Sequence, residues 1–274
     1  MLTLRTTHYA LRITHHAPHI MRNLYSVLPI SAFVLILAIW ELLAVFSGWS
    51  PRVFPGPLLV FISMKELIAD GTLIRHAVAS LFRVTAGFYL AILFGIPLGI
   101  MLGRLRKFQL FLNPVIQFLR PISPLAWIPL SMLWFGIGDK PAIFLIFLSS
   151  FFPLVVSTTV AVQSINPVYF HVAANFNFTR YEVVTKVVIP GMLPAVITAL
   201  RITVTIAWLV VVAAEMIAVK SGLGYLILDS RNALRMDYVM DGMIVIGLIG
   251  LLLDHVMMRL SRIEFVFWGK IASR

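Results

Sequence analysis

Long apolar stretches separated by short polar breaks occupy most of the chain. A helix rises 1.5 Å per residue, so about 20 apolar residues cross a hydrocarbon core of about 30 Å. Six stretches are long enough: residues 27–46, 76–103, 108–135, 142–162, 195–219 and 240–260. The pattern predicts an all-α integral membrane protein with six transmembrane helices.

The breaks between these stretches predict how the chain is organised. Residues 1–26 are expected to form an N-terminal tail and residues 27–47 the first transmembrane helix. Residues 50–75 are expected to form an external amphipathic segment. Residues 76–264 would form a five-helix core that contains a polar loop at 166–190, and residues 265–274 a C-terminal tail. Met21 is an alternative start, which the intact mass of the native protein would decide.

Small residues recur along one side of the second span. Gly87, Ala91, Gly95, Gly99 and Gly103 follow one another at intervals of four. Residues four apart lie on the same side of a helix, so this spacing predicts a smooth strip that packs closely against a neighbour.

The third span is interrupted by four prolines, at positions 114, 121, 124 and 129. A proline removes a backbone hydrogen bond, so we do not expect a regular helix throughout residues 108–135. Irregular backbone at membrane depth is tolerated where it is buried in protein or lines a wet cavity. Residues 120–129 are therefore candidates for the lining of a translocation pathway, with Arg120, Ser123, Pro124 and Trp127 as its side chains.

Charged residues within the spans must face protein or water, because a charge at the bilayer centre costs about 2.5–3.5 kcal/mol on insertion scales. Arg83 lies near the outer end of its span and is expected to snorkel to the interface. Arg120 and Arg201 either face an anion or pair with a carboxylate such as Glu215, and Arg201 has a third option of anchoring the polar loop. Glu215 pairs with an arginine, caps the turn at residues 220–222 or lines a gate, and it is kept among the pathway candidates.

Composition supports the membrane assignment independently. Hydrophobic residues make up 60% of the 274 residues and charged residues 12%, with a mean hydropathy of +0.97. Soluble domains have about a quarter charged residues. The absence of cysteine excludes disulfides and thiolate metal sites. His15, His16 and His19 have no carboxylate nearby, so we expect a solvated tail there and no metal site.

The basic residues indicate an orientation. The formal net charge is +11, but most Lys and Arg residues flank the apolar stretches, which favours membrane lipid over nucleic acid as the surrounding partner. Twelve of these residues fall in segments on one side and seven on the other, and the tightest cluster is Arg104, Arg106 and Lys107. The positive-inside rule then predicts cytoplasmic termini and a cytoplasmic loop at 166–190.

This loop has the pattern of a helix, a turn and a second helix, between residues 171 and 194. It resembles the EAA loop of binding-protein-dependent ATP-binding-cassette (ABC) importer permeases, which runs Glu-Ala-Ala, three residues, Gly, then a hydrophobic-x-x-Pro. In the alignment His171 takes the place of Glu, Val172 and Ala173 the alanines, Asn177 the glycine and Pro190 the proline. The acid and the glycine are both replaced. Asn tolerates the left-handed conformation, so we expect the turn to survive.

The resemblance implies that this loop couples the chain to an ATPase. The coupling residues it implies are His171, Val172, Ala173, Ala174, Asn177, Thr179, Arg180 and Pro190. It also implies a fold of the MetI-like permease type in the bacterial inner membrane. The expected partners are a second copy of the chain, two ATPase subunits that bind ATP and Mg, and an external substrate-binding protein.

The resemblance extends over about residues 51–262. The stretches 119–138 and 208–227 look like the subfamily that imports nitrate, bicarbonate, taurine and alkanesulfonates, which also includes some vitamin-precursor importers. It implies a small anion as cargo, with a vitamin or a pyrimidine or flavin precursor as the alternative. An ATP-independent channel or secondary transporter is a second alternative. The sequence holds no Walker motif, nucleophile elbow or His-Glu-x-x-His motif, so the chain is not expected to be an enzyme by itself.

Overall fold

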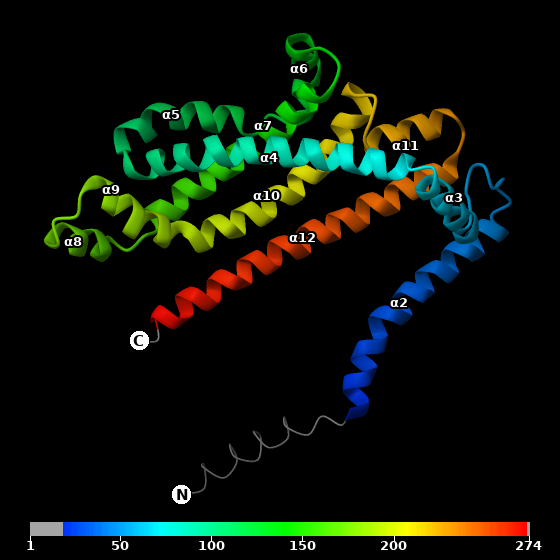
Figure 1. The fold of residues 1–274 in the computed structure, drawn as a ribbon, viewed down its shortest axis with the longest axis horizontal. Coiled ribbons are helices and arrows are strands. Elements are labelled where there is room, and N and C mark those ends of the chain that lie inside the picture. The colour runs from blue at the N-terminus through cyan, green and yellow to red at the C-terminus, as the bar shows by residue number, and fades with distance from the viewer. Residues whose placement is uncertain (1–18, 273–274) are drawn as a thin grey trace, which may run out of the picture. The chain divides into compact units, whose positions relative to one another are not determined.

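The computed structural model describes the backbone of residues 19–272 and the side chains of residues 31–259. The described elements are all helical, as expected (Figure 1). Most of the expected tail at residues 1–26, with His15 and His16, lies outside the described residues. The chain divides into two compact units at residues 62 and 63.

The first unit contains α2 (His19–Phe46) and the start of α3 (Pro57–Ala69). The connection between them folds back on α2, because the Trp40 indole N–H donates to the Pro55 carbonyl at 3.1 Å. Trp49 and Phe54 make an edge-to-face contact with ring centroids 5.8 Å apart. A helix in the segment 50–75 is confirmed, and its external position stays a prediction.

The second unit continues with the remaining elements. They are α4 (Thr72–Arg104), α5 (Arg106–Leu119), η1 (Pro124–Trp127), α6 (Ile128–Phe135), α7 (Asp139–Gln163), α8 (Pro167–Asn175), α9 (Arg180–Val183), η2 (Val184–Val188), α10 (Ile189–Ala218), α11 (Leu223–Asn232) and α12 (Met236–Ala272). Residues 265–272, expected in the C-terminal tail, are helical.

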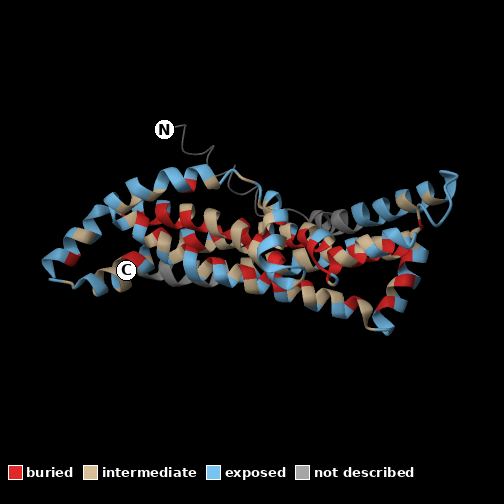
Figure 2. Ribbon diagram, turned by 90° about the horizontal axis from the view of Figure 1, so that it is seen from above, coloured by how far each residue is buried: buried red, intermediate tan, exposed pale blue. Residues whose placement is uncertain are grey.

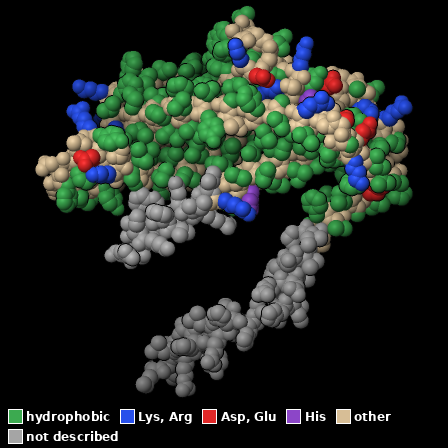
Figure 3. Space-filling view, in the orientation of Figure 1, with side chains coloured by type: hydrophobic (Ala, Val, Ile, Leu, Met, Phe, Trp, Pro, Cys, Tyr) green, Lys and Arg blue, Asp and Glu red, His purple; other side chains and the backbone are tan. Residues whose placement is uncertain are grey.

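Four described helical stretches are long and apolar enough to cross a membrane. They are Thr72–Arg104, Asp139–Gln163, Arg180–Ala218 and Met236–Arg259, and Ser31–Phe46 and Pro124–Phe135 are shorter apolar helices. The third expected span is broken, as predicted, but not at Pro114, which lies inside α5. Helix α5 ends at Leu119, before Pro121, and the chain resumes with the short helices η1 and α6. Figure 3 shows hydrophobic side chains over much of the visible face of the second unit, with charged groups towards its margins.

The glycine strip on α4 makes a close helix contact possible. A Cβ atom added at Gly87 would lie 2.7 Å from Ile146, and one added at Gly103 would lie 2.6 Å from Val162. At Gly99 the distance to the Thr158 Cβ atom would be 2.5 Å. The predicted close packing is therefore confirmed, and α7 is the neighbour. Figure 2 shows buried residues gathered where these helices meet.

Helix α10 packs against α7 and α12, and polar contacts also join it to α12. The Trp208 indole N–H donates to the Ile246 carbonyl at 3.0 Å. Arg201 forms two hydrogen bonds with Asp254, at 2.7 and 2.9 Å. Of the alternatives for Arg201, pairing with a carboxylate is therefore observed, and the partner is Asp254 and not Glu215.

Candidate functional site

The polar loop forms a compact elbow, which we define as α8, α9 and the turn between them. Helix α8 begins at Asn166, whose side chain accepts a hydrogen bond from the Val168 N–H at 3.0 Å. It ends in a Schellman motif. The Phe178 N–H donates to the Ala173 carbonyl at 2.9 Å, and the Asn177 N–H donates to the Ala174 carbonyl at 3.0 Å.

Asn177 takes the position in this motif that glycine usually occupies. Its φ angle is 54°, in the left-handed region. Asn is enriched there because its short polar side chain tolerates this backbone conformation. The predicted survival of the turn at Asn177 is confirmed.

The second half of the elbow begins with a capping box. The Thr179 hydroxyl accepts from the Glu182 N–H at 3.3 Å, and the Glu182 carboxylate accepts from the Thr179 N–H at 2.9 Å. Lys186 Nζ lies 2.8 Å from the same carboxylate and 4.9 Å from the centroid of the Phe178 ring. Glu182 and Lys186 were missed in the sequence, although Thr-x-x-Glu before an apolar run indicates such a cap.

The elbow continues into α10 without a break in the helix. Between α9 and α10 the chain passes through the five-residue π-helix η2, which stands next to Pro190. Proline has no N–H to give to the carbonyl four residues earlier, so a wider turn is a natural accommodation there. Helices α9 and α10 are therefore parts of one continuous helical stretch.

Seven of the eight expected coupling residues lie together on the elbow, and Pro190 follows at the start of α10. Ala173 is buried and Pro190 is half-buried, while the other expected coupling residues are exposed: His171, Val172, Ala174, Asn177, Thr179 and Arg180. A groove of about 590 Å³ separates α8 from the start of α10, lined in part by Tyr169, Phe178 and Pro190. Phe176 and Tyr181 are 71% and 78% exposed. Exposed aromatic side chains of this kind are frequent anchors in protein interfaces.

A further contact joins the elbow to α4. The Arg104 guanidinium, at the C-terminal end of α4, lies 4.6 Å from the centroid of the Phe170 ring on α8. Cation–π contacts of this geometry contribute about 0.5–1 kcal/mol at exposed sites. The elbow is thus linked to both α10 and the turn that leads into α5.

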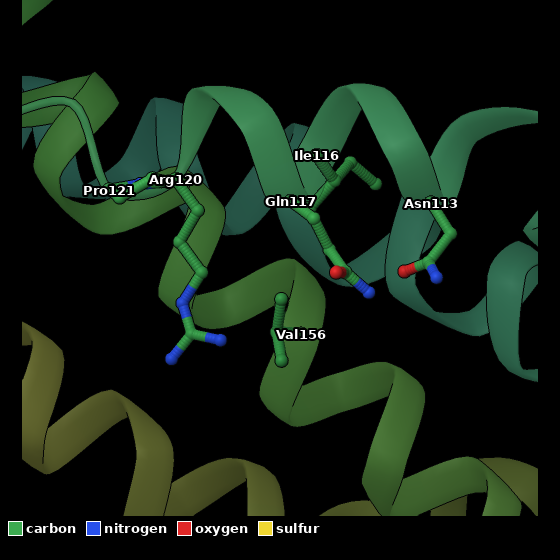
Figure 4. A pocket seen from close by; sticks show the side chains of 6 residues that line it. All are labelled: Asn113, Ile116, Gln117, Arg120, Pro121 and Val156. Atoms are coloured by element: carbon green, nitrogen blue, oxygen red, sulfur yellow. The ribbon is translucent and has the colours of Figure 1, made fainter.

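The proline-broken segment starts beside a polar cavity. Arg120 follows the last residue of α5, and its side chain lines a cavity of about 540 Å³ with Asn113, Gln117 and Val156 (Figure 4). Among the described residues Arg120 has no ion-pair partner. Pairing with a carboxylate is therefore not observed for Arg120.

The other pathway candidates do not line this cavity. Ser123 is exposed and precedes η1, and Pro124 is the first residue of η1. Trp127 is half-buried and packs against a cluster that includes Ile128, Ala142 and Ala214. The pathway roles of these residues stay predictions.

Glu215 lies in a separate buried cluster with Arg83. Arg83 is 1% exposed, and its Nη1 atom lies 2.6 Å from the Glu215 carboxylate, which is fully buried. Arg83 also donates from Nε to Asp139 at 2.8 Å and from Nη1 to the Ser221 carbonyl at 2.8 Å, and from Nη2 to the Ser221 hydroxyl. The expectation that Arg83 snorkels is wrong. Its partners come from α7, α10 and the turn before α11, which the sequence pattern did not bring together.

Glu215 also holds the turn that follows its own helix. Its second oxygen accepts from the Ser80 hydroxyl at 2.8 Å and from the Gly224 N–H at 3.0 Å. The Leu223 N–H donates to Ser80 at 2.9 Å. Pairing with an arginine is thus observed for Glu215. Its other oxygen bonds to Gly224 in the first turn of α11, just after residues 220–222, and its role in a pathway stays a prediction.

Residues 95–263 match the family described as binding-protein-dependent transport system inner membrane component. The chain belongs to this family of ABC importer permeases. The permease is 36% identical to the taurine transport system permease protein of Escherichia coli over 240 residues, which cover 86% of this chain and 87% of that one. It is 35% identical to the bicarbonate transport system permease protein of Synechococcus elongatus over 250 residues, or 86% and 88% of the two chains.

The fold of the permease is also that of a solved importer subunit. A chain of the MetNI methionine ABC transporter, in an inward-facing conformation, superposes with a TM-score of 0.63 at 17% identity. The match covers 70% of this chain and 96% of that one. The expected MetI-like permease fold is confirmed. Among the described residues no group of three or more His, Asp or Glu side chains is placed to hold a metal ion.

Proposed function

We propose that the permease forms the path of an ATP-driven importer for a small anion. It would work as a homodimer with two ATPase subunits and an external substrate-binding protein, in a bacterial inner membrane with both termini in the cytoplasm. The observation that carries the proposal is the elbow, a rigid and exposed structure that runs directly into a long apolar helix.

The elbow supports a mechanical route from the ATPase to the spans. The partner subunits would bind ATP and Mg and would close on each other, because this chain has no nucleotide-binding motif of its own. Closure would press on the exposed side chains of the elbow, including His171, Phe176 and Tyr181. The continuous helix from α9 through η2 would pass the movement to α10. The inward-open path would then become outward-open by rigid-body rotation.

The anionic cargo is supported by two observations. Two relatives are named for the transport of bicarbonate and of taurine, a sulfonate. Arg120 is a cation without an ion-pair partner among the described residues, beside a cavity of about 540 Å³. The alternative cargo, a vitamin or a pyrimidine or flavin precursor, is favoured by Trp134, which is 54% exposed and contacts Phe135 and Phe144. The ligand that copurifies with the cognate binding protein, identified by mass spectrometry, decides between them.

The coupling role is tested at Asn177. Asn177→Ile places a β-branched side chain at a φ of 54°. A left-handed conformation costs a residue with a Cβ atom about 1–2 kcal/mol, so the turn should open. In proteoliposomes that contain the ATPase and the loaded binding protein, we expect the stimulation of ATP hydrolysis to be lost.

The matched control is Asn177→Gly, which suits the same backbone conformation and should keep the stimulation. Wild-type stimulation in Asn177→Ile would contradict the coupling role. His171→Ala tests whether the imidazole has taken over the role of the missing acid, and retained stimulation would exclude that role. If no ATPase subunit copurifies with the chain, the alternative of an ATP-independent channel or secondary transporter is favoured instead.

A further inference from the structure

All the polar side chains of helix α5 except that of Lys107 lie in one narrow arc, together with Arg120, the residue after the helix. At 100° per residue, Arg106, Gln109, Asn113, Gln117 and Arg120 fall within about 80° of one another. Ile116, at the edge of this arc, is buried against Leu102 and Val155. The opposite side of α5 is exposed and apolar, with Phe111, Val115 and Phe118. We call the four residues Gln109, Asn113, Gln117 and Arg120 the α5 polar arc.

The side chains of the α5 polar arc are not satisfied within the chain. None of the four forms a side-chain hydrogen bond or an ion pair with any residue that the structure describes. An amide without a hydrogen-bond partner in hydrocarbon costs several kcal/mol, so such groups do not face lipid. The arc must therefore meet water, cargo or another protein chain.

Two cavities run along the α5 polar arc and meet at Asn113. One, of about 510 Å³, is lined by Gln109 and Asn113 together with Arg104 and Gln163, which lie at the ends of α4 and α7. The other, of about 540 Å³, is lined by Asn113, Gln117, Arg120 and Val156. Val156 lies seven residues before the end of α7, so the hollow reaches roughly 10 Å inward along that helix. Figure 4 shows Asn113, Gln117 and Arg120 on the same side of α5.

The chemistry of the arc favours an oxyanion. Residues 106–120 contain Arg, Lys, Gln and Asn but no Asp or Glu. Carboxamide N–H groups and a guanidinium are hydrogen-bond donors to carboxylate, sulfonate or similar oxygens, and Arg adds a charge of the matching sign. Arg106, one turn before the arc, and Arg120, at its end, give the whole row a positive potential, and no carboxylate in residues 106–120 competes for it.

We propose that the α5 polar arc is the cargo-facing wall of the translocation path, and that a small oxyanion passes along it by exchanging hydrogen bonds with successive side chains. This inference rests on the proposed function and adds the side chains that line the path. The arc extends the pathway from the proline-broken segment at residues 120–129 into α5, which stays helical through Pro114.

Single-cysteine labelling tests this wall, because the native chain contains no cysteine. Gln117→Cys reports on the arc. Val115→Cys, two residues away but on the opposite side of α5, is the matched control. The full-length chain with its ATPase subunit is placed in lipid nanodiscs, where reagents reach both membrane faces. Two small charged thiol reagents are compared, sulfonatoethyl methanethiosulfonate and trimethylammonioethyl methanethiosulfonate, with rates divided by those for free mercaptoethanol.

We expect Gln117→Cys to react about tenfold faster or more than Val115→Cys with the sulfonate reagent, since charged reagents are excluded from hydrocarbon. The sulfonate reagent should be preferred over the ammonium reagent at Gln117→Cys, and Arg120→Gln should reduce that preference. In water, a positive unit charge roughly 8 Å from the cysteine raises the local concentration of the sulfonate reagent about 2.4-fold and lowers that of the ammonium reagent by the same factor. Arg120→Gln removes that charge, so the ratio of the sulfonate rate to the ammonium rate should fall about sixfold.

Equal labelling rates at Gln117→Cys and Val115→Cys, or protection of Gln117→Cys, would overturn the proposal that the α5 polar arc faces the path. Protection would mean that the arc is covered, for example by the second copy of the chain. A preference for the ammonium reagent overturns the oxyanion chemistry. Asn113→Cys serves as a second reporter if Gln117→Cys does not assemble. The absence of any associated ATPase subunit would refute the proposed function itself, whereas an assembled and coupled complex with a protected arc refutes only this inference.

Discussion

The buried pair of Arg83 and Glu215 gives the sharpest prediction about stability, because both the direction and the size of the change in unfolding temperature follow from it. Arg83→Gln removes the cation and leaves the fully buried Glu215 carboxylate without an ionic partner. Loss of one partner from a buried ion pair costs about 3–5 kcal/mol. At 2–4 °C per kcal/mol for a chain of this size, the midpoint of thermal unfolding should fall by roughly 6–20 °C.

A second substitution, Glu215→Gln, should restore part of the stability that Arg83→Gln removes. Adding Glu215→Gln to Arg83→Gln removes the stranded charge and leaves two amides that are able to bond to each other. Glu215→Gln alone should be milder than Arg83→Gln, because Arg83 keeps Asp139 and the Ser221 carbonyl. Glu215→Gln should lower the free energy of unfolding by about 3 kcal/mol, the value of one charge-assisted hydrogen bond and one neutral hydrogen bond.

The assay is thermal unfolding of the purified chain in a mild detergent, followed by size-exclusion chromatography with fluorescence detection at matched detergent concentration. The expected order of unfolding midpoints is wild type, Glu215→Gln, the double variant, and Arg83→Gln as the lowest. A double variant that unfolds below Arg83→Gln, or a Glu215→Gln midpoint equal to that of wild type, would refute the reasoning. Either result would mean that the cluster is not a coupled ion pair in the folded chain.

Two further predictions concern packing and orientation. Gly99→Val should separate α4 from α7, because even a Cβ atom at residue 99 would lie 2.5 Å from the Cβ atom of Thr158. Overpacking of this kind costs about 1–3 kcal/mol of folding free energy. The yield of folded chain in size-exclusion chromatography measures the loss. Gly247→Val is the matched control on α12, where nothing lies within 4 Å, and a loss at Gly247 equal to that at Gly99 contradicts the argument. For orientation, a cysteine in place of Lys107 should be protected from an impermeant thiol reagent in intact cells, and one in place of Arg231 should react. The reverse pattern would place the elbow outside the cell, beyond the reach of an ATPase.

The elbow was predictable because its structure is local. A left-handed turn at Asn177, a capped helix start at Asn166 and a helical restart after Thr179 depend on residues within a few positions of each other. The same holds for the α5 polar arc, whose spacing of four is visible in Gln109, Asn113 and Gln117. The spacing alone does not show what the arc faces, and only the cavities beside it show that its side chains share an open space.

The sequence by itself determined the class of the protein, four of the six expected spans, the break after α5 and the smooth strip of α4. These features follow from composition and from the helical period, which act over a few turns. The tertiary structure alone decided the partners of the charged residues within the spans. Arg83 and Glu215 are 132 positions apart, and Arg201 and Asp254 are 53 apart. No local rule joins such residues; which carboxylate meets which arginine depends on how α4, α7, α10 and α12 pack, because a charge in a membrane protein takes the partner that packing brings within reach.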